Sequence, residues 1–175
     1  MNKQKPRLFA FILTLCFFAL VWMYVREFPL FSNTIGVGWL VLESMSVGLV
    51  AALVGVWQFR KRFMPWDRHL ADIAFIVVTT VFFAPLFGSW FNRGLGLPAS
   101  QTFEFVSETP YFAAGYGVLK GEKLTPTGYH LVVLENGVRR SFTYKTQAYF
   151  PITKPGESII LPVCKGLLGA KVMLL

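Results

Sequence analysis

The sequence has few of the residues from which catalytic and metal sites are usually built. Among 175 residues there are two cysteines, two histidines and nine acidic residues. No GxSxG, HExxH or CxxC motif occurs, and no glycine-rich phosphate loop. Cys16 lies in an apolar run and Cys164 in the C-terminal half, so no disulfide bond is expected within one chain. We therefore expect a protein without enzymatic activity, without a cofactor and without a metal site.

Charged residues are almost absent from three long segments. Residues 8–25 carry no charge, residues 35–59 carry only Glu43, and residues 70–91 carry only Asp72. Each segment is close to the length of about 20 mostly apolar residues with which a helix crosses the hydrocarbon core of a bilayer. None shows the short alternating pattern of membrane barrel strands. The sequence therefore predicts a membrane protein with a domain of three transmembrane helices over residues 8–91.

Basic residues gather in the tail 1–7 and in the loop 60–69, between the second and third segments. Short loops rich in lysine and arginine stay in the cytoplasm, so the part after residue 91 is expected outside. For a bacterial source, which we assume, this means the inner membrane with a periplasmic C-terminal domain. Topology explains much of the net charge of +8, so no nucleic-acid partner is expected. The residues expected at the lipid headgroups are Trp57, Arg60, Lys61, Arg62 and Trp66.

Small residues recur every four positions in the second segment. Ser44, Gly48 and Ala52 form one such row, and Ala51 and Gly55 form another. This spacing lets two helix backbones approach closely in lipid. Two interpretations remain open, which are packing within the chain and contact with a membrane partner, including an oligomer.

Glu43 is the one acid well inside a predicted span, where a carboxylate is costly and usually paired or functional. Arg26 and Arg93, near the outer ends of the other two segments, are the candidate ion-pair partners. Three roles remain open for Glu43: a structural acid, a group in ion- or proton-coupled transport, and a contact to a partner protein.

The C-terminal part has a different pattern. Residues 92–100 contain two glycines and a proline and are predicted to be a linker. From residue 101 the sequence alternates with a period of two, and Asn136–Gly137 between two such runs indicates a tight hairpin. We expect an extracytoplasmic β domain over residues 101–175, a partly open barrel of SH3-like or OB-like type.

Helices followed by a small barrel resemble the layout of NfeD-type membrane proteins. The resemblance is confined to this layout and to the glycine and proline spacing of the barrel, at Gly121, Pro126, Gly128, Gly156 and Gly166. It implies an architecture and no activity.

Three functions are compatible with these observations. The first is a non-enzymatic accessory subunit of a larger envelope complex for secretion, conjugation, transport or respiration. Its partners would be membrane lipids and other membrane or periplasmic proteins, with the β domain as the interaction module. The second is a transport-related protein that uses Glu43. The third is an immunity or exclusion protein that acts at the outer face.

Overall fold

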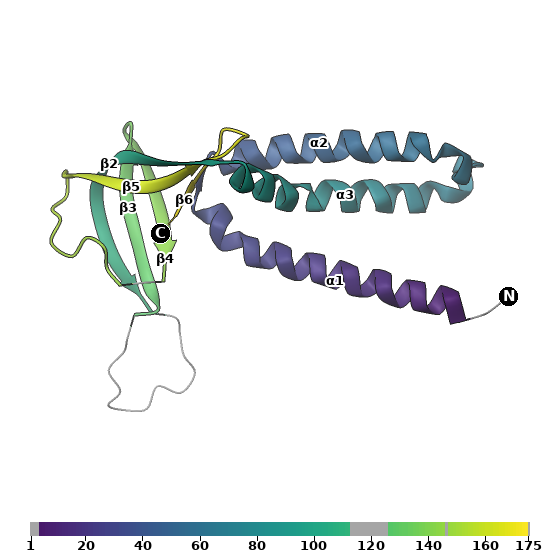
Figure 1. Ribbon diagram of the computed structural model, residues 1–175, viewed down its shortest axis with the longest axis horizontal. Coiled ribbons are helices and arrows are strands. Elements are labelled where there is room, and N and C mark those ends of the chain that lie inside the picture. Colours follow the sequence, from purple (N-terminus) through teal and green to yellow (C-terminus); the bar gives the residue numbers. More distant parts are fainter. Residues whose placement is uncertain (1–3, 113–125, 146, 175) are drawn as a thin grey trace, which may run out of the picture.

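The computed structural model describes residues 4–112, 126–145 and 147–174. Three helices extend from one end of a β-sheet (Figure 1): α1 (Gln4–Ser32), α2 (Val37–Gln58) and α3 (Trp66–Gly94). All three are long and apolar enough to cross a membrane, which confirms the prediction of three such helices. We call the end of each helix next to the sheet its sheet end. Of the predicted basic tail, residues 1–3 lie outside the described part, as does Gly121 with the rest of residues 113–125.

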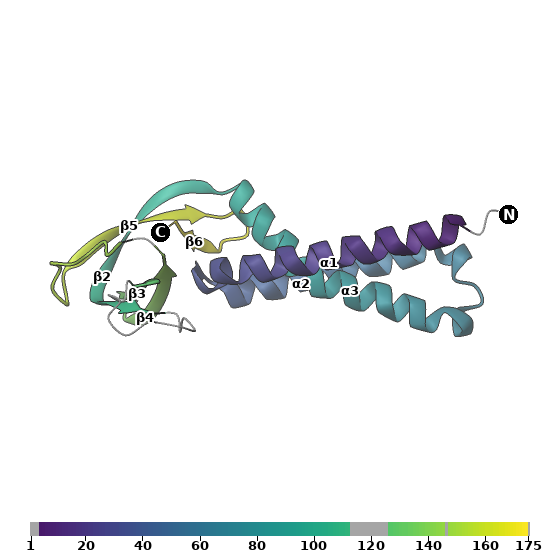
Figure 2. The same ribbon diagram turned by 90° about the horizontal axis from the view of Figure 1, so that it is seen from below.

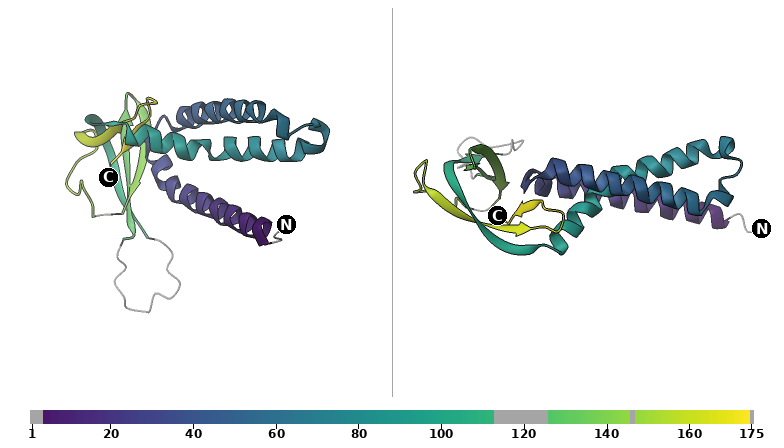
Figure 3. Two further views of the ribbon diagram at one scale, coloured as in Figure 1. Left: turned by 45° about the vertical axis from the view of Figure 1, so that its right-hand side comes forward. Right: turned by 90° about the horizontal axis from the view of Figure 1, so that it is seen from above.

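Two of the helices, α2 and α3, form a hairpin, and α1 lies farther from them. α2 and α3 are joined through a short 3-10 turn, Arg60–Arg62, and pack against each other. α1 meets α3 between its middle and its sheet end, and at its middle the Phe17 ring lies 5.8 Å from the Phe83 ring. Toward its N-terminus α1 diverges from the hairpin (Figures 1 and 3). α3 bends toward the sheet (Figure 2), and Pro85 inside it removes a backbone donor and accounts for a kink.

The sheet has six antiparallel strands and curls into a half-barrel (Figure 3). Along the sheet the strands follow the order β1-β6-β5-β2-β3-β4. Their bounds are β1 Thr34–Ile35, β2 Leu97–Tyr111, β3 Gly128–Glu135, β4 Val138–Tyr144, β5 Ser158–Lys165 and β6 Lys171–Met173. Asn136 and Gly137 both have positive φ, 50° and 78°, as the predicted hairpin requires.

Alternate residues of the strands fill the concave side of the sheet. In β5, for example, Ile159, Leu161 and Val163 are buried while the residues between them are exposed. This is the period-two pattern expected of a sheet with one covered face. The core also takes in Ile35 from β1, so a residue between two apolar helices belongs to the β domain.

The structure differs from the predicted domain bounds in two places. α3 continues to Gly94 and β2 begins at Leu97, so two residues connect helix and sheet where a linker over 92–100 was predicted. A Cβ atom on Gly96 would collide with Cys164 Sγ, so this glycine permits close packing and is not part of a loose hinge. The sheet also extends beyond residues 101–175, because β1 pairs with β6.

Candidate functional site

Asn33 joins the two edges of the half-barrel. It follows α1 and precedes β1, and only 7% of it is exposed. Its side-chain Nδ2 donates a hydrogen bond of 2.7 Å to the Thr143 carbonyl of β4, and Thr143 N–H donates one of 2.8 Å to Asn33 Oδ1. Its carbonyl accepts a bond of 3.0 Å from Met173 N–H. One amide side chain therefore pairs with β4 as a strand backbone would, and it closes the half-barrel at that point.

Beyond Thr143 the edge of β4 is open. In an antiparallel strand the backbone groups point to alternate sides, so Arg139 and Ser141 direct their N–H and C=O groups away from β3, as Thr143 does. Both residues are exposed. In the described part of the chain no backbone group pairs with these two residues on that side, because β4 is the last strand of the sheet.

Asn92 fastens α3 to the turn between β5 and β6, and it is completely buried. Nδ2 donates to the Ala170 carbonyl at 3.1 Å, and Leu168 N–H donates to Oδ1 at 2.9 Å. Leu167 N–H donates to the Asn92 carbonyl at 3.3 Å. A Cβ atom on Gly166 would collide with the Asn92 side chain, so that glycine is needed for the fit. Together with Asn33, this residue makes the helices and the sheet one unit.

Glu27 is the buried acid of the helix bundle, with 5% of its surface exposed. Its Oε1 accepts hydrogen bonds from Ser89 Oγ at 2.6 Å and Arg93 Nη2 at 2.7 Å, and its Oε2 accepts one from Trp90 Nε1 at 3.3 Å. All three donors belong to the last two turns of α3. The cluster therefore ties α1 to α3 near their sheet ends.

The predicted ion pair of Glu43 with Arg26 or Arg93 is not found among the described residues. Arg93 binds Glu27, and the Arg26 guanidinium lies 4.7 Å from the Trp22 ring centre. The difference arises because α1 does not end at residue 25. It continues to Ser32, which puts Glu27 inside the helix and opposite Arg93.

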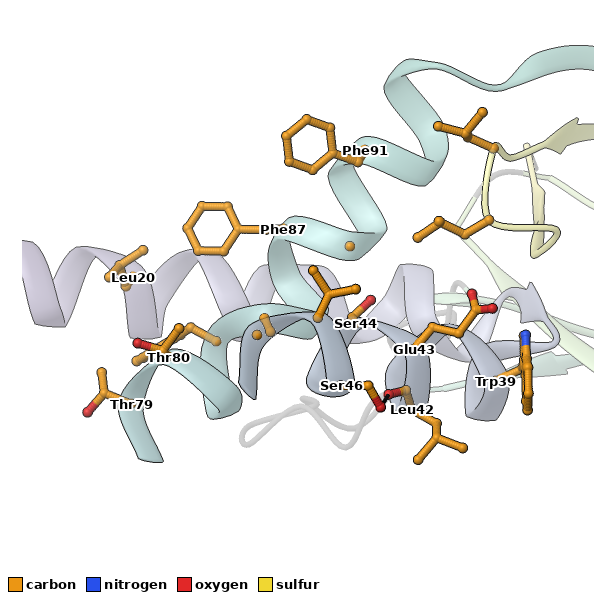
Figure 4. Close-up of a pocket in the computed structure, with 17 residues that line it drawn as sticks. Leu20, Trp39, Leu42, Glu43, Ser44, Ser46, Thr79, Thr80, Phe87 and Phe91 are labelled. Carbon is orange, nitrogen blue, oxygen red and sulfur yellow. Dashed lines mark hydrogen bonds between the residues drawn. The ribbon is translucent and has the colours of Figure 1, made fainter. Parts of the chain in front are cut away.

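Glu43 lies in a groove of about 920 Å³ along α2 and α3 (Figure 4). Its Oε2 is shielded from solvent and has no hydrogen-bond partner. The carboxylate points toward the turn between β5 and β6, from which Leu167 and Leu168 cover one end of the groove. The rest of the lining is mostly apolar. It includes Leu20 of α1 and, from α2 and α3, residues such as Ser44, Val47, Gly48, Ala84, Phe87 and Gly88.

The first row of small residues faces α3 within the same chain. Ser44, Gly48 and Ala52 are buried, and a Cβ atom on Gly48 would lie 2.6 Å from Ala84 Cβ. The second row differs, because Ala51 is exposed and nothing lies within 4 Å of a Cβ atom on Gly55.

We expect Gly48→Ala to lower the free energy of unfolding by about 1–2 kcal/mol, because the added methyl forces α2 and α3 apart. Gly55→Ala is the matched control, since its methyl meets open space. Reversible unfolding of the full chain in detergent micelles measures both. Equal stability of the two variants would contradict the close contact at Gly48.

Glu135, at the end of β3, is the charged centre of the sheet. Gln101 Nε2 donates to it at 2.7 Å and Lys171 Nζ at 3.3 Å, and Arg140 Nε lies 3.4 Å away. Burial by itself raises the pKa of the Glu135 carboxyl. The hydrogen bonds and the two positive charges outweigh burial, so the pKa lies below its usual value. Arg140 therefore belongs to a local ion network, whereas Arg139 stays exposed.

The residues predicted at the headgroups lie at the hairpin end away from the sheet. Arg60 stacks on Trp57 at 5.5 Å, and Arg62 stacks on Phe59 at 5.8 Å. Lys61 and Trp66 are exposed beside them. This end therefore presents aromatic rings and positive charges together.

Three residues of these clusters, Glu27, Asn33 and Asn92, are absent from the sequence-based candidates. Each is a polar residue that lies within two positions of one of the three apolar segments. The position beside an apolar segment is the only feature of the sequence that points to these residues. A polar side chain there is either solvated or forms hydrogen bonds to the next element of the chain. Only the partners decide between the two, and they are distant in the sequence: Arg93 is 66 positions from Glu27, and Thr143 is 110 positions from Asn33.

The fold defines a class of protein: three helices that can span a membrane, fastened to a β half-barrel by polar residues at the junction. In the part of the chain that the structure describes, no three histidine, cysteine or acidic side chains form a group that could hold a metal ion. No family model matches the chain, and no curated protein or solved structure matches it either.

Proposed function

We propose that the chain is a non-enzymatic accessory subunit of a larger envelope complex, anchored in the inner membrane of a bacterium. The basic end of the helix hairpin supports a cytoplasmic place for the loop around Arg60–Arg62. Three spans then put the sheet in the periplasm, where it acts as the interaction module. In this role the half-barrel is a small domain of SH3-like or OB-like type, as the strand pattern of the sequence predicts.

The single observation that carries this proposal is the open edge of β4. Exposed backbone N–H and C=O groups on an edge strand are a template for a strand of another protein. At Thr143 the edge is occupied by Asn33, and from Ser141 to Val138 it is free of backbone partners among the described residues. The partner would add an extended segment there, beside the exposed side chains of Val138 and Arg139.

The ties at the junction support the same proposal. Asn33 and Asn92 hold the sheet against the helices, and the Glu27–Arg93 pair holds α1 to α3 near the sheet. A docking edge that is fixed relative to the membrane loses less conformational freedom when a partner binds than one on a mobile linker. An adapter in a membrane assembly benefits from this rigidity.

Ser141→Pro tests the docking edge. The N–H of Ser141 faces away from β3, so proline removes a donor for a partner strand and leaves the β3–β4 ladder intact. Ser141→Thr is the matched control because it keeps this N–H. We expect gentle detergent extraction of the tagged chain to co-purify an envelope protein with the wild type and with Ser141→Thr, and to lose it with Ser141→Pro. Retention of the same protein by the folded proline variant would contradict docking at β4.

A further inference from the structure

Two opposite charges lie at the same depth of the helix bundle. Glu43 comes six residues after Val37, the start of α2, and Arg26 comes six residues before Ser32, the end of α1. At 1.5 Å per residue, each is about 9 Å from the sheet end of its helix. The two sheet ends are joined by four residues that contain β1, so they lie at one level. With the sheet ends placed at the boundary of a hydrocarbon core about 30 Å thick, both residues lie inside the hydrocarbon.

Neither charge is paired with an opposite charge among the described residues. Glu43 Oε2 is shielded and has no hydrogen-bond partner. The Arg26 side chain is exposed and lies over the Trp22 ring. Trp22 is one turn farther from the sheet, so the guanidinium points along α1 away from the sheet. A charge in hydrocarbon is expensive unless an opposite charge or a hydrogen bond compensates it.

The surfaces around the two charges also fit one another. Beside Arg26, α1 exposes the large side chains Phe18, Trp22 and Val25, which are 65%, 60% and 54% exposed. Beside Glu43, the groove of about 920 Å³ presents the exposed apolar side chains Leu42, Val47 and Phe87, while Gly48 and Gly88 in its wall face the α2–α3 contact of the same chain. Helices in lipid associate by van der Waals packing and by interhelical polar contacts, and an α1 helix that fills the groove of a second copy would supply both.

We propose that the chain associates with a second copy of itself, with Arg26 of one copy bound to Glu43 of its neighbour and α1 lying along the neighbour's α2–α3 groove. Each copy carries both halves of the contact, so a rotation that returns to the first copy after a whole number of steps forms a closed homo-oligomer. This contact uses the helix faces and leaves β4 free. Self-association and docking at β4 can therefore each fail without the other.

The test is the mass of the full-length chain in nanodiscs or a mild detergent, measured by light scattering and native mass spectrometry over a range of concentrations. The wild type is expected to form an oligomer. Glu43→Gln and Arg26→Gln should each weaken association by about tenfold or more and give monomers. Arg26→Glu combined with Glu43→Arg exchanges the charges and should restore the oligomer. Arg68→Gln, a change of an exposed arginine outside the contact, is the control.

Three results would overturn the proposal. One is a monomeric wild-type chain. Another is an oligomer that survives both single neutralisations. The third is a charge exchange that does not restore association, although circular dichroism shows the same helix content as in the wild type. If Glu43 binds a helix of a different protein instead, the chain does not self-associate and a second membrane protein co-purifies with it. That result would likewise exclude self-association.

Discussion

Glu27→Ala is expected to lower the free energy of unfolding of the full chain by about 3 kcal/mol. Removing one partner of a buried ion pair costs about 3–5 kcal/mol, because the other charge stays behind without compensation. The Arg93 side chain is 29% exposed, so water solvates part of the charge that is left unpaired. We therefore expect a loss at the lower end of that range. Ser89 and Trp90 lose their acceptor in the same change.

Denaturation of the chain in micelles or bicelles measures this loss. Glu27→Gln separates charge from hydrogen bonding, since an amide oxygen still accepts from Ser89 while the ion pair is gone. Its loss should fall between the wild type and Glu27→Ala. Glu104→Ala, at an exposed acid of β2, is expected to stay within about 0.5 kcal/mol of the wild type. If Glu27→Ala behaves like this control, the cluster does not hold α1 to α3.

Asn33→Ala is expected to cost about 2–3 kcal/mol and to open the half-barrel beside β4. Two hydrogen bonds of a buried amide are lost, at about 1 kcal/mol each, and the Thr143 backbone groups lose their partners. Hydrogen exchange of the Thr143 amide should become faster, because Asn33 Oδ1 is the group that this N–H binds. The stability loss is measured by denaturation and the local opening by exchange.

The neighbouring Ser32→Ala is the control for Asn33→Ala. Ser32 is exposed to solvent, and its hydroxyl bonds to a carbonyl within the same helix, Pro29, at 2.8 Å. Its loss should stay below about 0.5 kcal/mol. Unchanged protection of Thr143 in Asn33→Ala would show that the amide does not close the sheet.

Composition and periodicity are local signals, and what they predict here is local. The apolar runs predict three membrane-length helices, and alternation with an Asn–Gly turn predicts β3 and β4. The contacts that join helices to sheet are not local. Thr34–Ile35 becomes a strand only because β6, more than 130 positions later, offers it an edge. Two residues carry no strand periodicity, so this pairing has no signature in the sequence.

The ion pair that was expected at Glu43 and lies at Glu27 has the same origin, a contact that is not local in the sequence. Glu43 stands out because it interrupts an apolar run, whereas Glu27 lies just beyond the run at 8–25 and reads as a loop residue. The helix continues through Pro29 to Ser32, and the acid beyond the run becomes the buried one. The end of an apolar run marks where the side chains change from apolar to polar. The helix backbone can continue past that point.

The placement of the sheet outside the membrane and of the hairpin turn inside the cytoplasm is the claim on which the proposed function depends. Labelling of intact cells with a membrane-impermeant maleimide tests it most directly. Ile152→Cys probes the sheet domain, where this residue is 90% exposed, and Arg62→Cys probes the turn between α2 and α3. The wild-type chain gives the background from its own cysteines, which are Cys164, buried, and Cys16, exposed on the candidate span of α1. We predict labelling of Ile152→Cys in intact cells and of Arg62→Cys only after permeabilisation. The opposite pattern, or labelling of both from one side, would contradict the account.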